Sequence, residues 1–220
     1  LISGIATAAK ALKPDIEIYG VQAALYPSMY GAKKSETVVC AGQTIAEGIA
    51  VKEPGGLTRR IVDALVKDIL LVREEEIERA IAALLEIEKT VVEGAGAAAY
   101  AAVAAHPEIF QGKTVGLVLS GGNIDMRLLS NVILRELSRE GRILSLVVEI
   151  EDRPGLLAKI ATTVGTAGGN ILEVSHNRMM TDVPAKSADL GMVIEARDAA
   201  HAAEIRKSLE DAGFHLRRPK

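Results

Sequence analysis

The sequence predicts an α/β protein of two domains, in which a parallel sheet is followed by a smaller ferredoxin-like unit. In the first 141 residues, apolar strand-like runs alternate with helical segments, which is typical of a parallel sheet covered by helices on both faces. Further on, the predicted order changes to strand, helix, strand, strand, helix, strand. We therefore expect domains at residues 1–141 and 142–220.

The periodicity of apolar residues and the turn signals place each element of the first domain. We expect helices at residues 3–12, 61–66 and 74–88, and strands at 16–21, 68–72 and 114–119. A charged helix near residues 134–141 leads to the domain boundary. Because ligands in parallel sheets bind beyond the carboxyl ends of the strands, the loop after Leu119 is a candidate ligand site.

The second domain has the same kinds of signal in the βαββαβ order. We expect strands at residues 144–150, 171–177, 188–196 and 214–217, and helices at 155–167 and 199–212.

The composition excludes several classes of function. Lysine and arginine number 26 against 29 aspartates and glutamates, and no basic block is present, which argues against a nucleic-acid partner. Cys40 is the single cysteine, so an internal disulfide and a cysteine-based zinc site are excluded. No apolar run approaches the roughly 20 residues of a membrane-spanning helix. We expect a cytoplasmic protein without a membrane partner.

Three motifs rich in small residues are candidates for a ligand site, and each also has a purely structural interpretation. Residues 120–123 (Ser-Gly-Gly-Asn) follow a predicted strand, and the alternative is a tight turn without a ligand. Residues 44–50 combine Glu47 with Gly48, but Thr44 and Glu47 also fit a helix capping box. Residues 93–98 fit a glycine- and alanine-rich helix start equally well.

In this order and spacing, the three motifs resemble the fold-type II pyridoxal-phosphate enzymes, specifically the threonine ammonia-lyase and serine racemase group. The resemblance implies that Leu1 supplies the last amide of a loop that holds the cofactor phosphate. It further implies that Gly48 lies beside the cofactor and that Ser120 hydrogen-bonds its pyridine nitrogen. Glu47 and Glu93 match acidic positions near the substrate.

The same resemblance implies a catalytic lysine and a tetraglycine phosphate loop, which directly precedes the Leu-Ile-Ser-Gly-Ile-Ala start in this family. We expect both to lie upstream of Leu1, so that the chain is a fragment without ammonia-lyase activity of its own. Some relatives bind a divalent cation through an acid where this chain has Gln22, with further ligand positions at Tyr26 and Ser28. A neutral amide with weak companions is a poor magnesium site, so we expect no metal.

Two motifs of the second domain resemble the ACT domain: residues 151–157, which include Asp152, Pro154 and Gly155, and residues 168–171, which include Asn170. The resemblance implies an amino-acid effector pocket at a domain–domain interface, with Asp152, Gly155 and Asn170 as its residues. Independently, Pro154 suits a first helical turn, whose free amides accept a carboxylate. The alternative is a module that only dimerises.

For the whole protein, the resemblance implies pyridoxal-phosphate-dependent deamination of L-threonine to 2-oxobutanoate, and of L-serine to pyruvate. It also implies a homodimer or homotetramer regulated by a small amino acid, for which isoleucine or valine is our expectation. Two alternatives stay open: a serine racemase, and a non-catalytic amino-acid-binding regulatory module. The ACT-like unit favours the lyase, because feedback control suits a pathway enzyme.

Overall fold

The computed structural model describes residues 1–177 and 187–217, and its contacts divide the chain into two compact units, Leu1–Val132 and Ile133–Lys220. The division falls inside helix α7 (Met126–Arg139), and the first strand of the second unit begins at Ile143. The domain boundary that we place after residue 141 stays a prediction.

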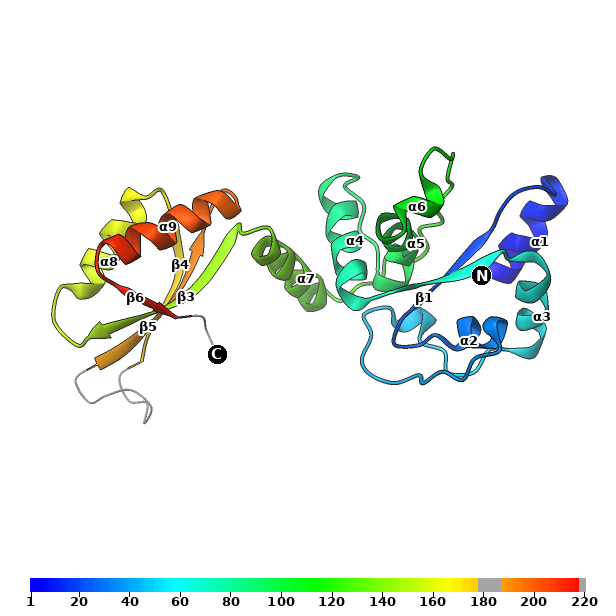
Figure 1. Cartoon of the computed structure of the whole chain (residues 1–220), viewed down its shortest axis with the longest axis horizontal. Coiled ribbons are helices and arrows are strands. Elements are labelled where there is room, and N and C mark those ends of the chain that lie inside the picture. Colours follow the sequence, from blue (N-terminus) through cyan, green and yellow to red (C-terminus); the bar gives the residue numbers. More distant parts are fainter. Residues whose placement is uncertain (178–186, 218–220) are drawn as a thin grey trace. The chain divides into compact units, whose positions relative to one another are not determined.

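The first unit is built around a parallel pair of strands. Its elements are α1 (Ile2–Leu12), β1 (Tyr19–Ala23), α2 (Ser28–Lys34), the 3-10 helix η1 (Glu47–Ile49), α3 (Gly56–Leu65), β2 (Asp68–Val72), α4 (Glu74–Glu86), α5 (Gly94–Ala105) and α6 (Pro107–Phe110). The parallel register runs from Tyr19 opposite Asp68 to Ala23 opposite Val72. Figure 1 shows this unit in blue to green.

Helices cover both faces of this strand pair, as the sequence predicts for a parallel sheet. Successive side chains of a strand point to opposite faces. Ile69 packs in one cluster with Ala6 of α1 and Val62 of α3, whereas the next residue, Leu70, packs in another cluster with side chains of α4 and α5. The buried α5 side chains in that cluster are all alanines, which allow α4 to approach closely.

The predicted strand at residues 114–119 does not form. These residues have no regular secondary structure and pair with neither β1 nor β2. A strand depends on hydrogen bonds to a neighbouring strand, and within the described residues this segment has none. Its apolar side chains at positions 115 and 117–119 consequently remain 37% to 48% exposed.

The second unit has the predicted ferredoxin-like order. It contains the end of α7, β3 (Ile143–Glu151), α8 (Leu156–Thr166), β4 (Asn170–Asn177), β5 (Ser187–Glu195), α9 (Ala199–Asp211) and β6 (His215–Arg217). The strands form an antiparallel sheet in the order β4-β5-β3-β6, so β4 lies at one edge. The predicted architecture, a parallel α/β domain followed by a ferredoxin-like unit, is confirmed.

The core of the second unit lies between one face of this sheet and helices α8 and α9 (Figure 1). Alternate residues of β3 and β5 are buried, including Leu146 and Leu190. His201 of α9 is also buried, and both of its ring nitrogens are hydrogen-bonded: Nδ1 accepts the N–H of Arg197 at 3.1 Å, and Nε2 lies 2.8 Å from the carbonyl oxygen of Ala167. Because Nδ1 accepts a hydrogen bond, Nε2 is the nitrogen that can donate to Ala167, and His201 thereby joins the end of α8 to the start of α9.

No helix in the described ranges, 1–177 and 187–217, is long and apolar enough to cross a membrane.

Candidate functional site

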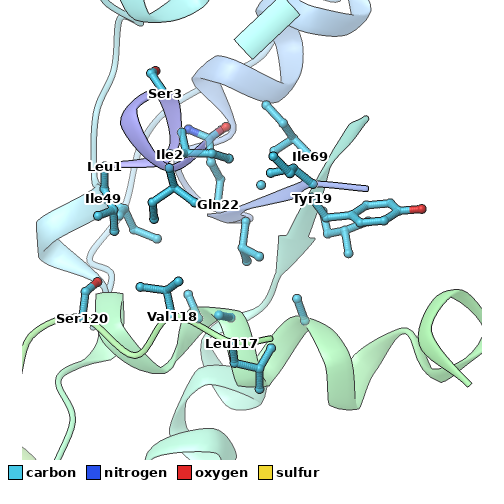
Figure 2. A pocket seen from close by; sticks show the side chains of 18 of the residues that line it. Leu1, Ile2, Ser3, Tyr19, Gln22, Ile49, Ile69, Leu117, Val118 and Ser120 are labelled. Atoms are coloured by element: carbon cyan, nitrogen blue, oxygen red, sulfur yellow. The ribbon is translucent and has the colours of Figure 1, made fainter. Parts of the chain in front are cut away.

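A cavity of about 940 Å³ opens in the first unit, between the start of α1, strand β1, helix α5 and residues 113–118 and 120. Figure 2 shows its largely apolar lining, with Ile2, Ile49 and Val118 among the labelled side chains. Four of the five residues predicted to contact cofactor or substrate line this cavity: Leu1, Gly48, Glu93 and Ser120. The fifth, Glu47, is exposed on η1 and is not part of the lining.

The start of α1 brings free backbone amides to the cavity. Leu1 is the N-cap residue, and its carbonyl oxygen accepts the first helical hydrogen bond from the N–H of Ile5 at 3.1 Å. No side-chain hydrogen bond caps this end within the described chain, and no acid lies in the first turn. The amides that precede Ile5 therefore have no partner inside the helix, and such an end favours an anion.

The Ser120–Gly121 turn rests directly on the first turn of α5. The backbone N–H of Glu93 donates to the carbonyl oxygen of Gly121 at 3.1 Å. A Cβ placed on Gly96 would lie 2.4 Å from the carbonyl oxygen of Ser120, so only glycine allows this approach. The contact fixes the position of Ser120, whose hydroxyl lies at the edge of the cavity in Figure 2.

Glu93 connects the motif at residues 44–50 with the motif at residues 120–123, because its side chain lies close to Gly48 and to Gly121. A Cβ on Gly121, which has φ +91°, would lie 2.4 Å from Glu93 Oε1, and a Cβ on Gly48 would lie 3.6 Å from the same atom. Gly48 also approaches Ala95, with 3.2 Å between a built Cβ and the Ala95 Cβ. The structure thus brings Gly48, Glu93 and Ser120 to one wall, although they are far apart in sequence.

Charged side chains stand beside the apolar lining. Glu17 and Lys113 both line the cavity, and Glu17 also pairs with Lys67. The hydrogen bond from Lys67 holds the pKa of Glu17 below its ordinary value, against the opposing effect of desolvation, and Lys113 at 3.4 Å acts in the same direction as Lys67. This carboxylate therefore stays ionised at neutral pH, which marks this part of the cavity as its polar side.

The three positions considered for a metal are occupied in hydrogen bonds within the protein. Gln22 Oε1 accepts the N–H of Tyr30 at 2.9 Å, and its Nε2 lies 3.4 Å from Ser28 Oγ. The Ser28 hydroxyl donates to the carbonyl oxygen of Val51 at 2.6 Å, and Tyr26 donates to a carbonyl oxygen of the following loop at 2.8 Å. Across the described residues, no group of three or more His, Cys, Asp or Glu side chains has the arrangement of a metal site.

The three residues predicted for the effector do not meet within one copy of the chain. Asp152 and Gly155 follow the end of β3, where Glu151 pairs with the start of β5. Asn170 begins β4 at the other end of the sheet, opposite Glu195, whose carboxylate its side chain contacts at 3.0 Å. At about 3.3 Å per residue, the length of β4 separates the two ends by roughly 20 Å.

His176, which is not among the predicted effector residues, lies at the same end of the sheet as Asp152, with 3.9 Å between His176 Nε2 and Asp152 Oδ1. Gly155, with φ +91°, is the N-cap residue of α8, and no side-chain hydrogen bond caps this end within the described chain. The first amides of α8, which follow Asp152 closely in sequence, therefore have no partner inside the helix, and they favour an anion for the same reason as those of α1.

Comparison with known proteins identifies both units. Residues 1–121 match the family model described as pyridoxal-phosphate dependent enzyme, and residues 144–213 match the ACT domain. The chain belongs to the pyridoxal-phosphate-dependent enzyme family. It is 39% identical to an L-threonine ammonia-lyase of Thermotoga maritima over 219 residues, which is 99% of this chain and 54% of that protein. An L-threonine ammonia-lyase of Geobacter sulfurreducens is 43% identical over 217 residues, with coverage of 97% and 54%.

Solved structures agree with this assignment. The T.th. threonine deaminase superposes with a TM-score of 0.54 and 33% identity, over 57% of this chain and 42% of that one. Maize serine racemase superposes with a TM-score of 0.54 and 31% identity, over 62% and 44%. The chain spans about half the length of the curated relatives that it matches.

The residues of this pyridoxal-phosphate family member fit the cofactor. A volume of about 940 Å³ lies within the range of small-molecule sites, which is roughly 300–1,000 Å³. The free amides at the start of α1 suit a phosphate, and the hydroxyl of Ser120 is a neutral partner for a ring nitrogen. Gly48 presents no side chain, so a planar ring can approach its backbone.

The capping-box interpretation of residues 44–47 is wrong, and the structure shows what Thr44 does instead. The N-cap of η1 is Ala46, without a side-chain cap. The Thr44 hydroxyl donates to Glu74 Oε1 at 2.7 Å, and Glu74 Oε2 accepts the N–H of Ile45 at 2.7 Å. In the sequence, Glu74 is only one of several acids at the start of a helix, and no local signal indicates a contact 30 residues away.

Proposed function

We propose that the protein containing this chain is an L-threonine ammonia-lyase, which converts L-threonine to 2-oxobutanoate and ammonia, and L-serine to pyruvate. The observation that carries this proposal is the match to two L-threonine ammonia-lyases over 97% to 99% of the chain, through the cavity and the ACT domain alike. The single Cys40, which is a free thiol, agrees with a cytoplasmic location.

The residues of the cavity support distinct roles in this reaction. When bound, pyridoxal phosphate supplies an electron-withdrawing ring that weakens bonds at the substrate α-carbon. The first-turn amides of α1, beginning at Leu1, hold the phosphate group. The Ser120 hydroxyl would hydrogen-bond the ring nitrogen without adding a charge. Because Gly48 has no side chain, its backbone can lie close to one face of the ring.

Glu93 is the acid that we assign to the substrate. Its carboxyl group stands between Gly48 and Gly121 on the cavity wall, where it can accept hydrogen bonds from a substrate ammonium or hydroxyl. Glu47 is exposed on η1 and is not part of the lining, so we assign no substrate contact to it.

A coupled assay tests the proposed reaction. The protein loaded with pyridoxal phosphate should form 2-oxobutanoate from L-threonine far faster than the free cofactor does. The likeness to maize serine racemase supports one alternative, for which D-serine would form from L-serine at a rate that exceeds the release of pyruvate. A protein that forms neither product would favour a non-catalytic amino-acid-binding module.

We also propose that the ACT unit binds an amino-acid effector between two copies of the chain. β4 is an edge strand, and antiparallel pairing of two β4 strands would bring Asn170 of one copy to the Asp152–Gly155 loop of the other. The effector carboxylate would face the free amides at the start of α8, and its ammonium would face Asp152 and the second copy's Asn170. A homodimer is the smallest assembly that completes this pocket.

Isoleucine and valine are the effectors that we expect, and calorimetry on the cofactor-loaded protein tests them. A coupling of about 1–3 kcal/mol, the usual size for allosteric effects, would change substrate affinity roughly 5- to 150-fold. Asn170→Ala should weaken effector binding while leaving deamination unchanged. If isoleucine, valine and threonine all fail to bind at millimolar concentration, the unit serves assembly alone.

A further inference from the structure

The side chain of Glu74 connects helix α4 to the segment that carries Gly48. Glu74 is the first residue of α4, and each of its two carboxylate oxygens accepts one hydrogen bond from this segment. The hydroxyl of Thr44 donates to Oε1 and the backbone N–H of Ile45 donates to Oε2, both at 2.7 Å. Hydrogen bonds to an ionised carboxylate are about twice as strong as neutral ones, and the N-terminus of a helix favours the negative charge.

These hydrogen bonds continue along the segment to Gly48. Thr44 Oγ1 also accepts the backbone N–H of Ala46 at 3.1 Å, and both residues are buried. Ala46 is the N-cap residue of η1, and its carbonyl oxygen accepts the N–H of Ile49 at 3.0 Å. Gly48 lies inside this single turn, so its position follows from where Thr44 is held.

The opposite side of the segment lies against the first turn of α5. A Cβ on Gly94 would lie 2.3 Å from the carbonyl oxygen of Ile45 and 3.0 Å from the nitrogen of Ala46. Gly48 itself approaches Ala95. The segment is thus held between a carboxylate on α4 and the backbone of α5, and a loss of the carboxylate releases one of its two sides.

We propose that Glu74 is a positioning residue for the cofactor site: by binding Thr44 and Ile45, it sets where Gly48 faces Glu93 on the cavity wall. Glu74 itself does not line the cavity, so it acts through this segment and touches neither cofactor nor substrate. The proposal rests on the proposed function, because it assumes that the wall formed by Gly48 and Glu93 contacts pyridoxal phosphate.

Glu74→Gln and Glu75→Gln form a matched pair of variants. Both remove one negative charge from the first turn of α4, but the carboxylate of Glu75 faces Arg73, with Oε1 2.8 Å from Arg73 Nη2. Glutamine at position 74 keeps one acceptor oxygen and replaces the other with a donor, which cannot accept the N–H of Ile45. We expect the dissociation constant of pyridoxal phosphate to rise about 10- to 100-fold for Glu74→Gln, and less than about twofold for Glu75→Gln.

Two substitutions of Thr44 test the same contact from its other side. Thr44→Val keeps the shape and removes the hydroxyl, whereas Thr44→Ser keeps the hydroxyl. Thr44→Val should weaken cofactor binding, and Thr44→Ser should restore it to within about threefold of the wild type. Because both changes break one linked contact, the double variant with Glu74→Gln should be less impaired than the product of the two single effects.

The measurements are cofactor titration followed by absorbance and fluorescence of bound pyridoxal phosphate, thermal unfolding without cofactor, and kcat and KM for threonine. Positioning predicts an altered cofactor spectrum and a lower kcat in Glu74→Gln, in excess of any loss of thermal stability. A Glu74→Gln protein with a lower melting temperature but an unchanged spectrum and affinity would assign Glu74 a structural role alone and overturn the proposal. A wild-type protein that binds no pyridoxal phosphate would instead refute the proposed function, and the role of Glu74 with it.

Discussion

Replacing Gly96 with alanine should damage the cofactor site, because the added methyl group would clash with the Ser120–Gly121 turn. Gly96 is buried in the first turn of α5, under the Ser120–Gly121 turn. A Cβ at this position would lie 2.4 Å from the carbonyl oxygen of Ser120 and 2.8 Å from that of Gly121, whereas ordinary contact begins at 3.4 Å. Both obstacles are backbone atoms, so no side chain can rotate out of the way.

The size of the effect follows from two opposing contributions. Alanine is the better helix former by about 1 kcal/mol, which favours the variant. Overpacking of this kind costs about 1–3 kcal/mol, and the Ser120–Gly121 turn has to move by about 1 Å to relieve the contact. Since a misplacement of about 1 Å can cost about 10²-fold in rate, we expect turnover to fall by roughly that factor while stability falls by at most ~2 kcal/mol.

Gly165→Ala is the matched control, because a Cβ on Gly165 of α8 would meet nothing within 4 Å. It should stabilise the protein by up to about 1 kcal/mol and leave turnover and cofactor binding unchanged. Urea unfolding and the 2-oxobutanoate assay measure the two effects. If Gly96→Ala stabilised the protein as much as Gly165→Ala does and kept full activity, the packing of Ser120 against α5 would not be needed for the site.

Three further predictions concern single side chains. Ser120→Ala should keep the fold and the cofactor but lose most threonine deamination. Ser120→Asp should raise transamination as a side reaction, because a carboxylate keeps the ring nitrogen protonated. Unchanged kinetics in both variants would rule out the role of Ser120. His201→Ala should lower the free energy of unfolding of the second unit by about 2–4 kcal/mol, measured by thermal unfolding, because it leaves a cavity in place of a buried side chain and removes the hydrogen-bond partner of two partly buried backbone groups. For Glu76, burial tends to raise the pKa, but hydrogen bonds from the backbone and guanidinium of Arg73 outweigh it and lower the pKa. The resulting stability is present above the ordinary glutamate pKa and is lost as pH falls through the lowered one, so urea unfolding of the wild type and of Glu76→Gln should differ at neutral pH and converge in acid.

The sequence predicted the elements from β3 to β6 to within one residue, because their signals are local, whereas it placed β1, α3 and α7 several residues away from their observed bounds and missed α2 and α6. Strand β2 and the first residue of α4 are as predicted, since an apolar run followed by acidic helix-starting residues needs no distant partner to be recognised. Residues 114–119 have the composition of a buried strand equally clearly, but a strand exists only where another strand supplies its hydrogen bonds. The pattern of apolar residues indicates which secondary structure a segment favours, but it does not indicate whether a strand is present for that segment to pair with.

Prediction of the candidate site has the same limit, because the site depends on contacts between residues that are far apart in the sequence. Gly48, Glu93 and Ser120 were selected from their motifs. The structure brings them to one wall because Gly94 and Gly96 allow close approach between backbone segments and Gly121 leaves room for the Glu93 side chain. Glu74 could not be selected, since its function lies in a contact 30 residues away and its local setting already explains an acid there. Asn170 presents the opposite problem: its motif points to an effector, but the antiparallel sheet places it far from Asp152 within one copy. The position of Asn170 is explained if a second copy of the chain completes the effector site. Regulation by the ACT unit would then depend on pairing through the edge strand β4.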